Sequence, residues 1–318
     1  MRPELEKVLQ ETEKVIAGKR EVIRKILTAL LAEGHILLDD VPGVGKTTLA
    51  VALTRAVGLS FRRVQFTPDV LPSDLTGFSM VDKNSGEFVY RPGLLKGVNL
   101  LLGDEINRAS SKTQSALLEA MEERQVTVDG KTYPLESPFL VIATENSVGT
   151  AGTQMLPYAQ MDRFLVRLSL GYPDYEAQMA MLRDRQGANP IDTVQQVLTR
   201  EELCGLQRGV RAVTSREPVL DYITRLTLAS RKHEALEVGI SPRGALFLDR
   251  MAKARAFLEG RDYVTGGDVQ EVFADVCAHR VLLKENAREA SVRQVLEELL
   301  KKTENPDRRA LFSGHRKL

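Results

Sequence analysis

The 318-residue chain contains no tryptophan, only two cysteines and four histidines. The cysteines, Cys204 and Cys277, are far apart and lack the spacing of metal ligands, which argues against a zinc site and against a disulfide framework. No apolar run is long enough to span a bilayer, and the charged, helical N-terminus lacks the pattern of a signal peptide. These absences predict a protein of the reducing cytoplasm without a membrane span.

The chain also lacks an excess of charge of either sign. Lys and Arg together number 44 and Asp and Glu 43, so the formal net charge is +1. Non-specific binding of nucleic acid generally requires a basic face, and this balance therefore argues against nucleic acid as a partner. The hydrophobic content of 43% is ample for a sizeable core, and the length predicts two domains.

A phosphate-binding loop is predicted in residues 35–48, HILLDDVPGVGKTT. A short apolar run is followed by a Pro/Gly turn and a helical pattern, the order expected of a strand, a loop and a helix whose N-terminus attracts phosphate. Lys46 would reach the β- and γ-phosphates of ATP, and the Thr47 hydroxyl would bind Mg²⁺. The residues expected around the nucleotide phosphates are Gly43, Val44, Gly45, Lys46, Thr47 and Thr48.

The match to the GxxxxGK[ST] pattern is incomplete, because Asp40 stands where the first glycine is expected. A glycine-rich turn before an ordinary helix is the alternative for this stretch taken alone. A helix pair expected at residues 3–17 and 21–32 would either close over the base of the nucleotide or serve as plain core helices.

Two carboxylates follow a second buried apolar run. Residues 100–103 have the composition of a parallel strand buried on both faces, whose carboxyl end faces the ligand crevice. Asp104 would hold Mg²⁺ there, and Glu105 would orient and polarise the attacking water, unless the strand simply reaches solvent. A further strand, residues 139–143, leads to Asn146, which would bond the attacking water or the γ-phosphate, or else form a turn.

Two β-hairpins are predicted within this alternation of strands and helices. Residues 77–93 alternate apolar and polar side chains around Asn84-Ser85-Gly86, and residues 125–133 carry Asp129-Gly130, the usual type I′ turn signal. With further strands at residues 63–66 and 164–170, the pattern predicts an α/β domain with a mostly parallel sheet in residues 1–173.

Residues 174–318 are predicted to be helical, with no further strands after Pro173. Capping signals occur at Thr199, Ser241 and Thr265, and apolar spacing predicts a buried face that includes Leu246. The last ~15 residues are polar enough to be partly disordered. A small helical bundle is therefore expected after the α/β domain.

The phosphate loop, the acidic strand end, the Asn-tipped strand and MDRF (161–164) occur in the order of the AAA+ ATPases, which the chain resembles. It is most similar to the MoxR family, in GDEINRASSKTQSALLEAMEERQVTVDG (103–130), FLVIATEN (139–146) and LPYAQMDRF (156–164). The resemblance covers nearly the whole chain. It implies ATP and Mg²⁺ as cofactors and a P-loop AAA+ domain with a five-stranded parallel sheet, followed by a small all-α lid domain.

The same resemblance implies two hairpins of the helix-2-insert group, projecting toward the pore of a homo-oligomeric ring, expected to be a hexamer. The site residues that it implies are Lys46 and Thr47 (Walker A), Asp104 and Glu105 (Walker B), Asn146 (sensor 1), Arg163 (arginine finger), Arg243 (sensor 2), and Ile16 and Gly18 near the adenine. The sequence departs from the family at Glu145 and Ser147, in place of Gln and Pro, and at Lys19, in place of Gln.

Arg243 can also be judged by its position alone. It lies about two residues into a helix that begins at Ser241-Pro242, where the positive end of the helix dipole disfavours a cation. A bound triphosphate or an exposed salt bridge would offset this cost.

These observations predict an ATP-hydrolysing ring motor of chaperone type that remodels or activates a partner protein. The resemblance implies a partner with a von Willebrand factor A domain, and the sequence does not identify this client. One alternative is a ring ATPase that acts on nucleic acid, which the charge balance disfavours. The other is a nucleotide-gated scaffold with little turnover, which the presence of Glu105 disfavours.

Overall fold

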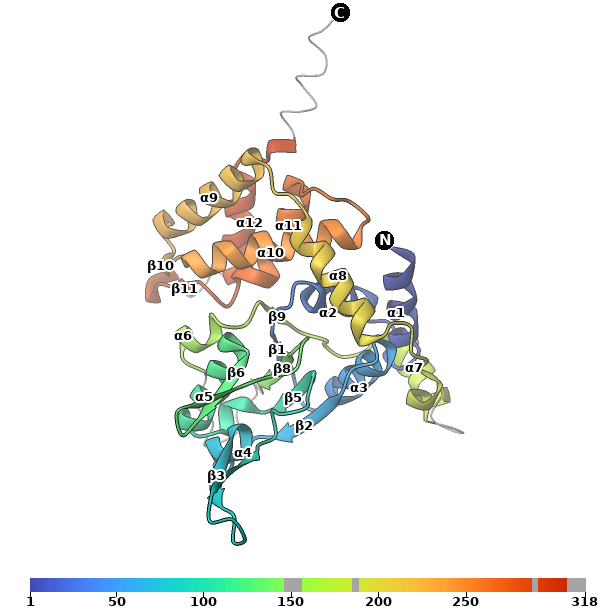
Figure 1. Ribbon diagram of the computed structural model, residues 1–318. Helices are drawn as coiled ribbons and strands as arrows, with labels where there is room; N and C mark the ends of the chain where they lie inside the picture. The colour runs from blue at the N-terminus through green and yellow to red at the C-terminus, as the bar shows by residue number, and fades with distance from the viewer. Residues whose placement is uncertain (146–155, 185–188, 288–290, 308–318) are drawn as a thin grey trace, which may run out of the picture.

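The computed structural model describes residues 1–145, 156–184, 189–287 and 291–307. Within these residues, five parallel strands form the central sheet in the order β2-β5-β8-β1-β9, and a helical domain lies above it (Figure 1). The strands are β1 (Ile36–Asp39), β2 (Phe61–Gln65), β5 (Leu100–Asp104), β8 (Leu140–Glu145) and β9 (Val166–Leu168). The predicted five-stranded parallel sheet is confirmed, and β5 and β8 are buried along their whole length.

The helices of the α/β domain are placed largely as the apolar spacing predicts. They are α1 (Pro3–Glu13), α2 (Arg20–Leu31), α3 (Lys46–Ala56), α4 (Pro72–Thr76), α5 (Ser111–Glu123) and α6 (Tyr158–Met161), with a 3₁₀ turn at Ile106–Arg108. The helix expected over residues 3–17 ends early. Val15 and Ile16 both donate to the Thr12 carbonyl, which tightens the last turn, and the chain then reverses at Gly18 with a φ of +72°.

Alternate side chains of the sheet enter two different apolar clusters. Leu101 packs with α5 on one face, whereas Leu100 and Leu102 pack with α1, α2 and α3 on the other. The second cluster continues into the lid helices, and Gln207 of the lid donates to the Leu30 carbonyl of α2 at 2.8 Å. The lid therefore rests on the N-terminal helices, while the predicted boundary at residue 173 stays a prediction.

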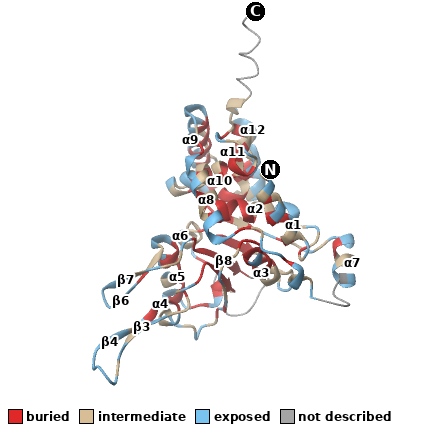
Figure 2. Cartoon of the chain, turned by 45° about the vertical axis from the view of Figure 1, so that its right-hand side comes forward, coloured by how far each residue is buried: buried red, intermediate tan, exposed pale blue. Residues whose placement is uncertain are grey.

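Both predicted hairpins are present. They consist of β3 (Gly77–Val81) with β4 (Phe88–Pro92), and β6 (Gln125–Val128) with β7 (Lys131–Pro134), each pair antiparallel. Asp129 and Gly130 have φ values of +50° and +72°, as a type I′ turn requires. Tyr90 and Tyr133 stack with their ring centroids 3.9 Å apart and so join the two hairpins, which extend together from the α/β domain (Figure 2).

The described chain after residue 173 is mainly helical. Its elements are α7 (Tyr175–Asp184), α8 (Arg200–Ala212), α9 (Glu217–Lys232), β10 (Leu236–Val238), α10 (Pro242–Leu258), α11 (Gly266–Cys277), β11 (Leu282–Leu283) and α12 (Val292–Lys302), with 3₁₀ turns at Pro190–Thr193 and Glu285–Ala287. The capping side chains predicted at Thr199, Ser241 and Thr265 all accept a backbone N–H three residues on.

Two expectations for the lid are wrong. Strands do not stop at Pro173, because β10 and β11 pair as a short antiparallel ribbon. Leu246 is not buried: 71% of its surface is exposed. It shares the outer face of α10 with Arg243 and Lys253, three residues before it and seven after it, whereas Phe247 and Met251 turn inward.

Two further expectations cannot be located. Asn146 and most of the last ~15 residues lie outside the described part of the chain. Within the described part, no helix is both long and apolar enough to cross a membrane.

Candidate functional site

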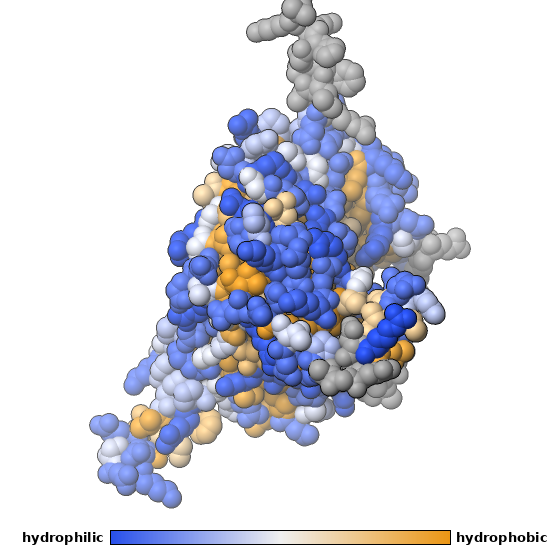
Figure 3. Space-filling view, turned by 90° about the vertical axis from the view of Figure 1, so that its right-hand side faces the viewer, coloured by the Kyte–Doolittle hydropathy of each residue, from blue (hydrophilic) through white to orange (hydrophobic). Residues whose placement is uncertain are grey.

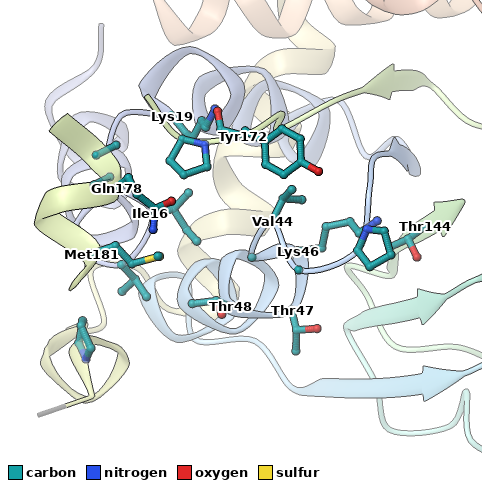
Figure 4. A pocket seen from close by; sticks show the side chains of 18 of the residues that line it. Ile16, Lys19, Val44, Lys46, Thr47, Thr48, Thr144, Tyr172, Gln178 and Met181 are labelled. Atoms are coloured by element: carbon teal, nitrogen blue, oxygen red, sulfur yellow. The ribbon is translucent and has the colours of Figure 1, made fainter. Parts of the chain in front are cut away.

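A cavity of about 610 Å³ lies at the carboxyl edge of the sheet, between the phosphate loop, residues 14–19 and α7. Figure 4 shows Lys46 and Thr144 at one end of this cavity, and Ile16, Gln178 and Met181 at the other. One end is therefore polar and the other largely apolar. This division suits a ligand with a charged group at one end and a flat apolar group at the other.

The phosphate loop has the backbone that an anion requires. Gly43 and Gly45 have φ values of +84° and +96°, which residues with a Cβ rarely adopt. Gly45 is the N-cap of α3 and provides no side-chain cap, so the first N–H groups of α3 are left for a ligand. The Lys46 ammonium donates to the Asp40 carbonyl at 2.9 Å. Burial lowers the pKa of Lys46, while the neighbouring carboxylates of Asp40 and Asp104 oppose that lowering.

The structure gives Asp40, in place of the expected glycine, a structural role. Its carboxylate accepts hydrogen bonds from the Ser169 hydroxyl at 2.7 Å and from the N–H groups of Leu170 and Gly171 at 2.6 and 2.9 Å. Asp40 is 6% exposed. It ties the end of β1 to the segment that leads to Tyr172, and thus joins the phosphate end of the cavity to its apolar end.

The two carboxylates after β5 line the polar end of the cavity. The Thr144 hydroxyl at the end of β8 accepts the Glu105 N–H at 2.9 Å and donates to Asp104 at 3.3 Å. Glu105 itself has a φ of +55°, a left-handed backbone that turns the chain sharply after the strand. Thr144 thus contacts the carboxylate of Asp104 and the backbone of Glu105, and no motif in the sequence predicted this role.

Three further polar side chains at this end were missed by the sequence analysis. Arg63 donates from Nε to Asp104 at 2.6 Å, while Gln65 and Arg108 donate to Glu105 at 3.1 and 2.9 Å. Strands β2 and β5 are adjacent and in register from Phe61 with Leu100 onward, which brings Arg63 and Gln65 to the two acids. The order of strands in the sheet carries this information for Arg63 and Gln65, whereas Arg108 lies only three residues after Glu105, in the 3₁₀ turn that follows β5.

The residues present fit a nucleoside triphosphate with Mg²⁺. The Thr47 hydroxyl and the Asp104 carboxylate both line the cavity, and oxygen atoms of these kinds are the ligands that Mg²⁺ prefers. The free N–H groups of α3 and the Lys46 ammonium supply positive charge for the phosphates. Glu105 is the remaining acid at this end and has the chemistry to act on water.

The two residues predicted to lie near the adenine, Ile16 and Gly18, are placed differently at the apolar end. Ile16 lines it, together with Tyr172 and Met181. Gly18 is not among the described residues that line the cavity. A Cβ there would lie 3.0 Å from Ala177, so Gly18 lets α7 approach. Lys19, one of the departures from the family, donates to the Tyr172 carbonyl at 2.7 Å.

Arg163 and Arg243 are absent from the described lining of the cavity and lie together elsewhere. Arg163 donates to the Leu118 carbonyl at 3.1 Å and pairs with Glu122 at 2.8 Å. Arg243 forms an ion pair with the same Glu122. A bound triphosphate or a salt bridge was expected to offset the cost of placing Arg243 at a helix N-terminus, and the structure contains the salt bridge. Asn146, the fourth predicted catalytic residue, lies outside the described residues.

Comparisons with known proteins agree with this fold. A model of the ATPase family associated with various cellular activities (AAA) matches residues 35–166, and a model of the AAA lid domain matches residues 228–299. A crystal structure of a proposed ATPase from Cytophaga hutchinsonii is similar, with a TM-score of 0.87 and 38% sequence identity. The match covers 95% of this chain and 94% of that chain.

Sequence relatives extend the comparison over most of the chain. The chain is 45% identical to the uncharacterized protein YeaC of Bacillus subtilis, over 93% of this chain and 94% of that protein. It is 40% identical to Chaperone MoxR1 of Mycobacterium tuberculosis, over 89% of this chain and 77% of that protein. It is also 34% identical to Protein MoxR of Paracoccus denitrificans, over 87% of this chain and 89% of that protein. The chain belongs to the MoxR family of AAA+ ATPases.

Proposed function

We propose that this chain hydrolyses ATP with Mg²⁺ as a ring motor of chaperone type. Lys46 binds the β- and γ-phosphates, Thr47 and Asp104 hold the metal, and Glu105 orients and polarises the attacking water. Bound Mg²⁺ neutralises charge that develops on the phosphate oxygens. Asn146, by its place directly after β8, bonds the attacking water or the γ-phosphate.

The observation that supports the ring is the position of Arg163 and Arg243. Neither arginine is part of the described lining of its own nucleotide cavity, and both converge on Glu122. The exposed Leu246 side chain lies on the same face of α10 as Arg243 and offers an apolar contact beside the two cations. We infer that this face meets the nucleotide site of a neighbouring subunit, in a ring that we expect to be a hexamer.

The client is proposed to be a protein with a von Willebrand factor A domain, or another protein, in the cytoplasm. One support is the name chaperone carried by a relative that is 40% identical. Another is the hairpin of β3 and β4, whose Phe78 and Phe88 side chains are 52% and 75% exposed. Figure 3 shows apolar side chains on this projection behind a hydrophilic tip. Both cysteines are unpaired, in keeping with a reducing compartment.

Measurements of ATP binding and of ATP hydrolysis distinguish the proposed roles of Lys46 and Glu105. Lys46→Ala is expected to lose ATP binding, because it removes the charge that pairs with the phosphates. Glu105→Gln is expected to keep ATP affinity while kcat falls by a factor on the order of 10²–10⁴. Calorimetric binding of ATP with Mg²⁺ and release of phosphate are the two measurements.

Lys83→Ala, at the exposed tip of the first hairpin, is the matched control and should leave both measurements unchanged. Hydrolysis by Glu105→Gln at the wild-type rate would remove Glu105 from the proposed role. ATP binding by Lys46→Ala at wild-type affinity would remove this cavity as the nucleotide site.

A further inference from the structure

We propose that Glu122 is a positioning residue whose carboxylate holds Arg163 and Arg243 together, so that both guanidinium groups face the nucleotide of the neighbouring subunit. The inference rests on the proposed ring ATPase and assigns a role to a residue outside the nucleotide cavity. Glu122 lies in the last turn of α5. Arg163 follows α6, and Arg243 is in the first turn of α10.

The geometry of the ion pairs divides the carboxylate between the two arginines. Oε2 of Glu122 pairs with Arg163, and Oε1 pairs with Arg243. Arg163 is held a second time by the Leu118 carbonyl, one turn earlier on α5. An arginine has five N–H donors. The Nε and Nη2 of Arg163, and the Nε and Nη1 of Arg243, donate to no described residue, so donors remain for a phosphate.

Stability does not account for this arrangement. The side chains of Glu122, Arg163 and Arg243 are 39%, 33% and 36% exposed, and ion pairs at such exposure contribute little to folding because solvent screens them. Two guanidinium groups that meet at one carboxylate also repel each other. The trio carries a net charge of +1, which suits contact with an anionic group that arrives from outside the subunit.

The backbone segments that carry Arg163 and Arg243 are linked to each other by contacts that do not involve Glu122. Asp162, directly before Arg163, pairs with the Nε of Arg280 at 2.9 Å and accepts the Ser241 hydroxyl at 3.2 Å. Arg280 is fully buried, and Ser241 is the N-cap of α10. This cluster fixes the backbone positions of the two arginines relative to each other. The carboxylate of Glu122 then fixes where their side chains end.

Glu122→Gln keeps the size of the side chain and removes its charge. One of the two acceptor oxygens then becomes an amide NH2 group, so the side chain can no longer accept from both arginines. We expect kcat of the assembled protein to fall about 10- to 100-fold, as for misplaced catalytic groups. The ATP affinity, the melting temperature and the oligomeric mass should not change. Glu122→Asp keeps the charge and should retain more activity than Glu122→Gln. Glu119→Gln is the matched control, since Glu119 lies one turn earlier on α5 and lines a second cavity, separate from the nucleotide cavity, whose lining also includes Glu122 and Arg163.

Mixed oligomers identify the subunit on which Glu122 acts. Glu122→Gln mixed with Lys46→Ala should regain activity, because the Lys46→Ala subunit offers an unaltered arginine pair to an unaltered phosphate loop. Glu122→Gln mixed with Arg163→Ala should stay at the low rate, because neither subunit offers that pair. The mixture of Arg163→Ala with Lys46→Ala tests the proposed ring independently and should regain activity.

The possible outcomes are distinct. A Glu122→Gln protein with the wild-type kcat overturns the inference, and so does one that melts early or fails to assemble, because Glu122 would then be structural. Recovery with Arg163→Ala but not with Lys46→Ala would place its action in its own subunit and also overturn it. If Arg163→Ala and Lys46→Ala fail to complement each other, the proposed function fails, and the role of Glu122 fails with it.

Discussion

Glu145, at the carboxyl end of β8, is a buried carboxyl with only 5% of its surface exposed. Its Oε1 accepts the Leu156 N–H at 3.3 Å. Burial raises the pKa of Glu145, because the charged form loses its hydration. The Leu156 N–H and the Arg167 guanidinium act against this rise, and the Asp39 carboxylate adds to it. The charged side chain is therefore costly at neutral pH, at a position where the resemblance leads us to expect Gln.

Replacement of Glu145 by Gln should stabilise the protein at neutral pH. In the wild type, the folded state holds the Glu145 proton more tightly than the unfolded state. The free energy of unfolding should therefore fall as the pH rises from the ordinary carboxyl range through the raised pKa, and then level off. The Gln variant lacks this dependence, so its advantage should grow across that window and disappear below it. Denaturant unfolding of the nucleotide-free protein at a series of pH values measures the difference.

Glu87→Gln, in the exposed first hairpin, is the control and should change stability little at any of these pH values. If Glu145→Gln gives no added stability at pH 7, or if the added stability does not change with pH, then burial does not raise the pKa of this carboxyl.

At the scale of elements, the two hairpins differ from the rest of the α/β domain because they extend into solvent (Figure 2). Phe78 and Phe88 contribute little to either apolar cluster of the core. Their replacement by Ser should shift the melting temperature by no more than about 2 °C. Basal hydrolysis should also be unchanged, because neither side chain lines the nucleotide cavity.

Capture of a client should respond differently to the same change. A Glu105→Gln protein loaded with ATP is expected to retain client proteins from a lysate, and the added Phe78→Ser and Phe88→Ser substitutions should abolish that retention. Lys83→Ser with Glu87→Ser, at the hydrophilic tip, should preserve it. Loss of folding in the Phe variant would instead make the hairpin an ordinary sheet edge.

Elements with local signals were predictable from the sequence. Asp129-Gly130 specified its turn because both residues accept positive φ, and Thr199 and Thr265 specified helix starts because their side chains cap neighbouring N–H groups. Leu246 was predicted wrongly. Its spacing fits the edge of an apolar stripe, but the sequence of the helix does not show which residues of other elements cover that stripe.

The candidate site could be predicted only where one segment carries it. The phosphate loop and the acids after β5 are contiguous in sequence, and the structure places them in one cavity. The contacts of Arg63 and Gln65 with these acids depend on strand order, and Glu122 meets Arg243 across 121 positions of sequence. Such pairings follow from the tertiary arrangement, which local patterns do not contain.

At the scale of the whole molecule, α5 and α6 lie beneath α10 on one side, away from α1 and α7 (Figure 1). The nucleotide cavity is bordered by residues 14–19 and α7. The arginine pair and the cavity of the same subunit therefore occupy separate places. A ring of such subunits can bring the arginine pair of one subunit to the cavity of the next.

Completion of the site by the neighbouring subunit can be tested by measuring hydrolysis per subunit as a function of protein concentration, together with oligomeric mass, at saturating ATP and Mg²⁺. The rate should be low where the mass is that of a single chain and rise steeply as oligomers form. Arg163→Ala should stay low throughout, since an arginine finger contributes a factor on the order of 10³ or more. A full rate per subunit at concentrations where only single chains are present would contradict the claim that the neighbouring subunit completes the site.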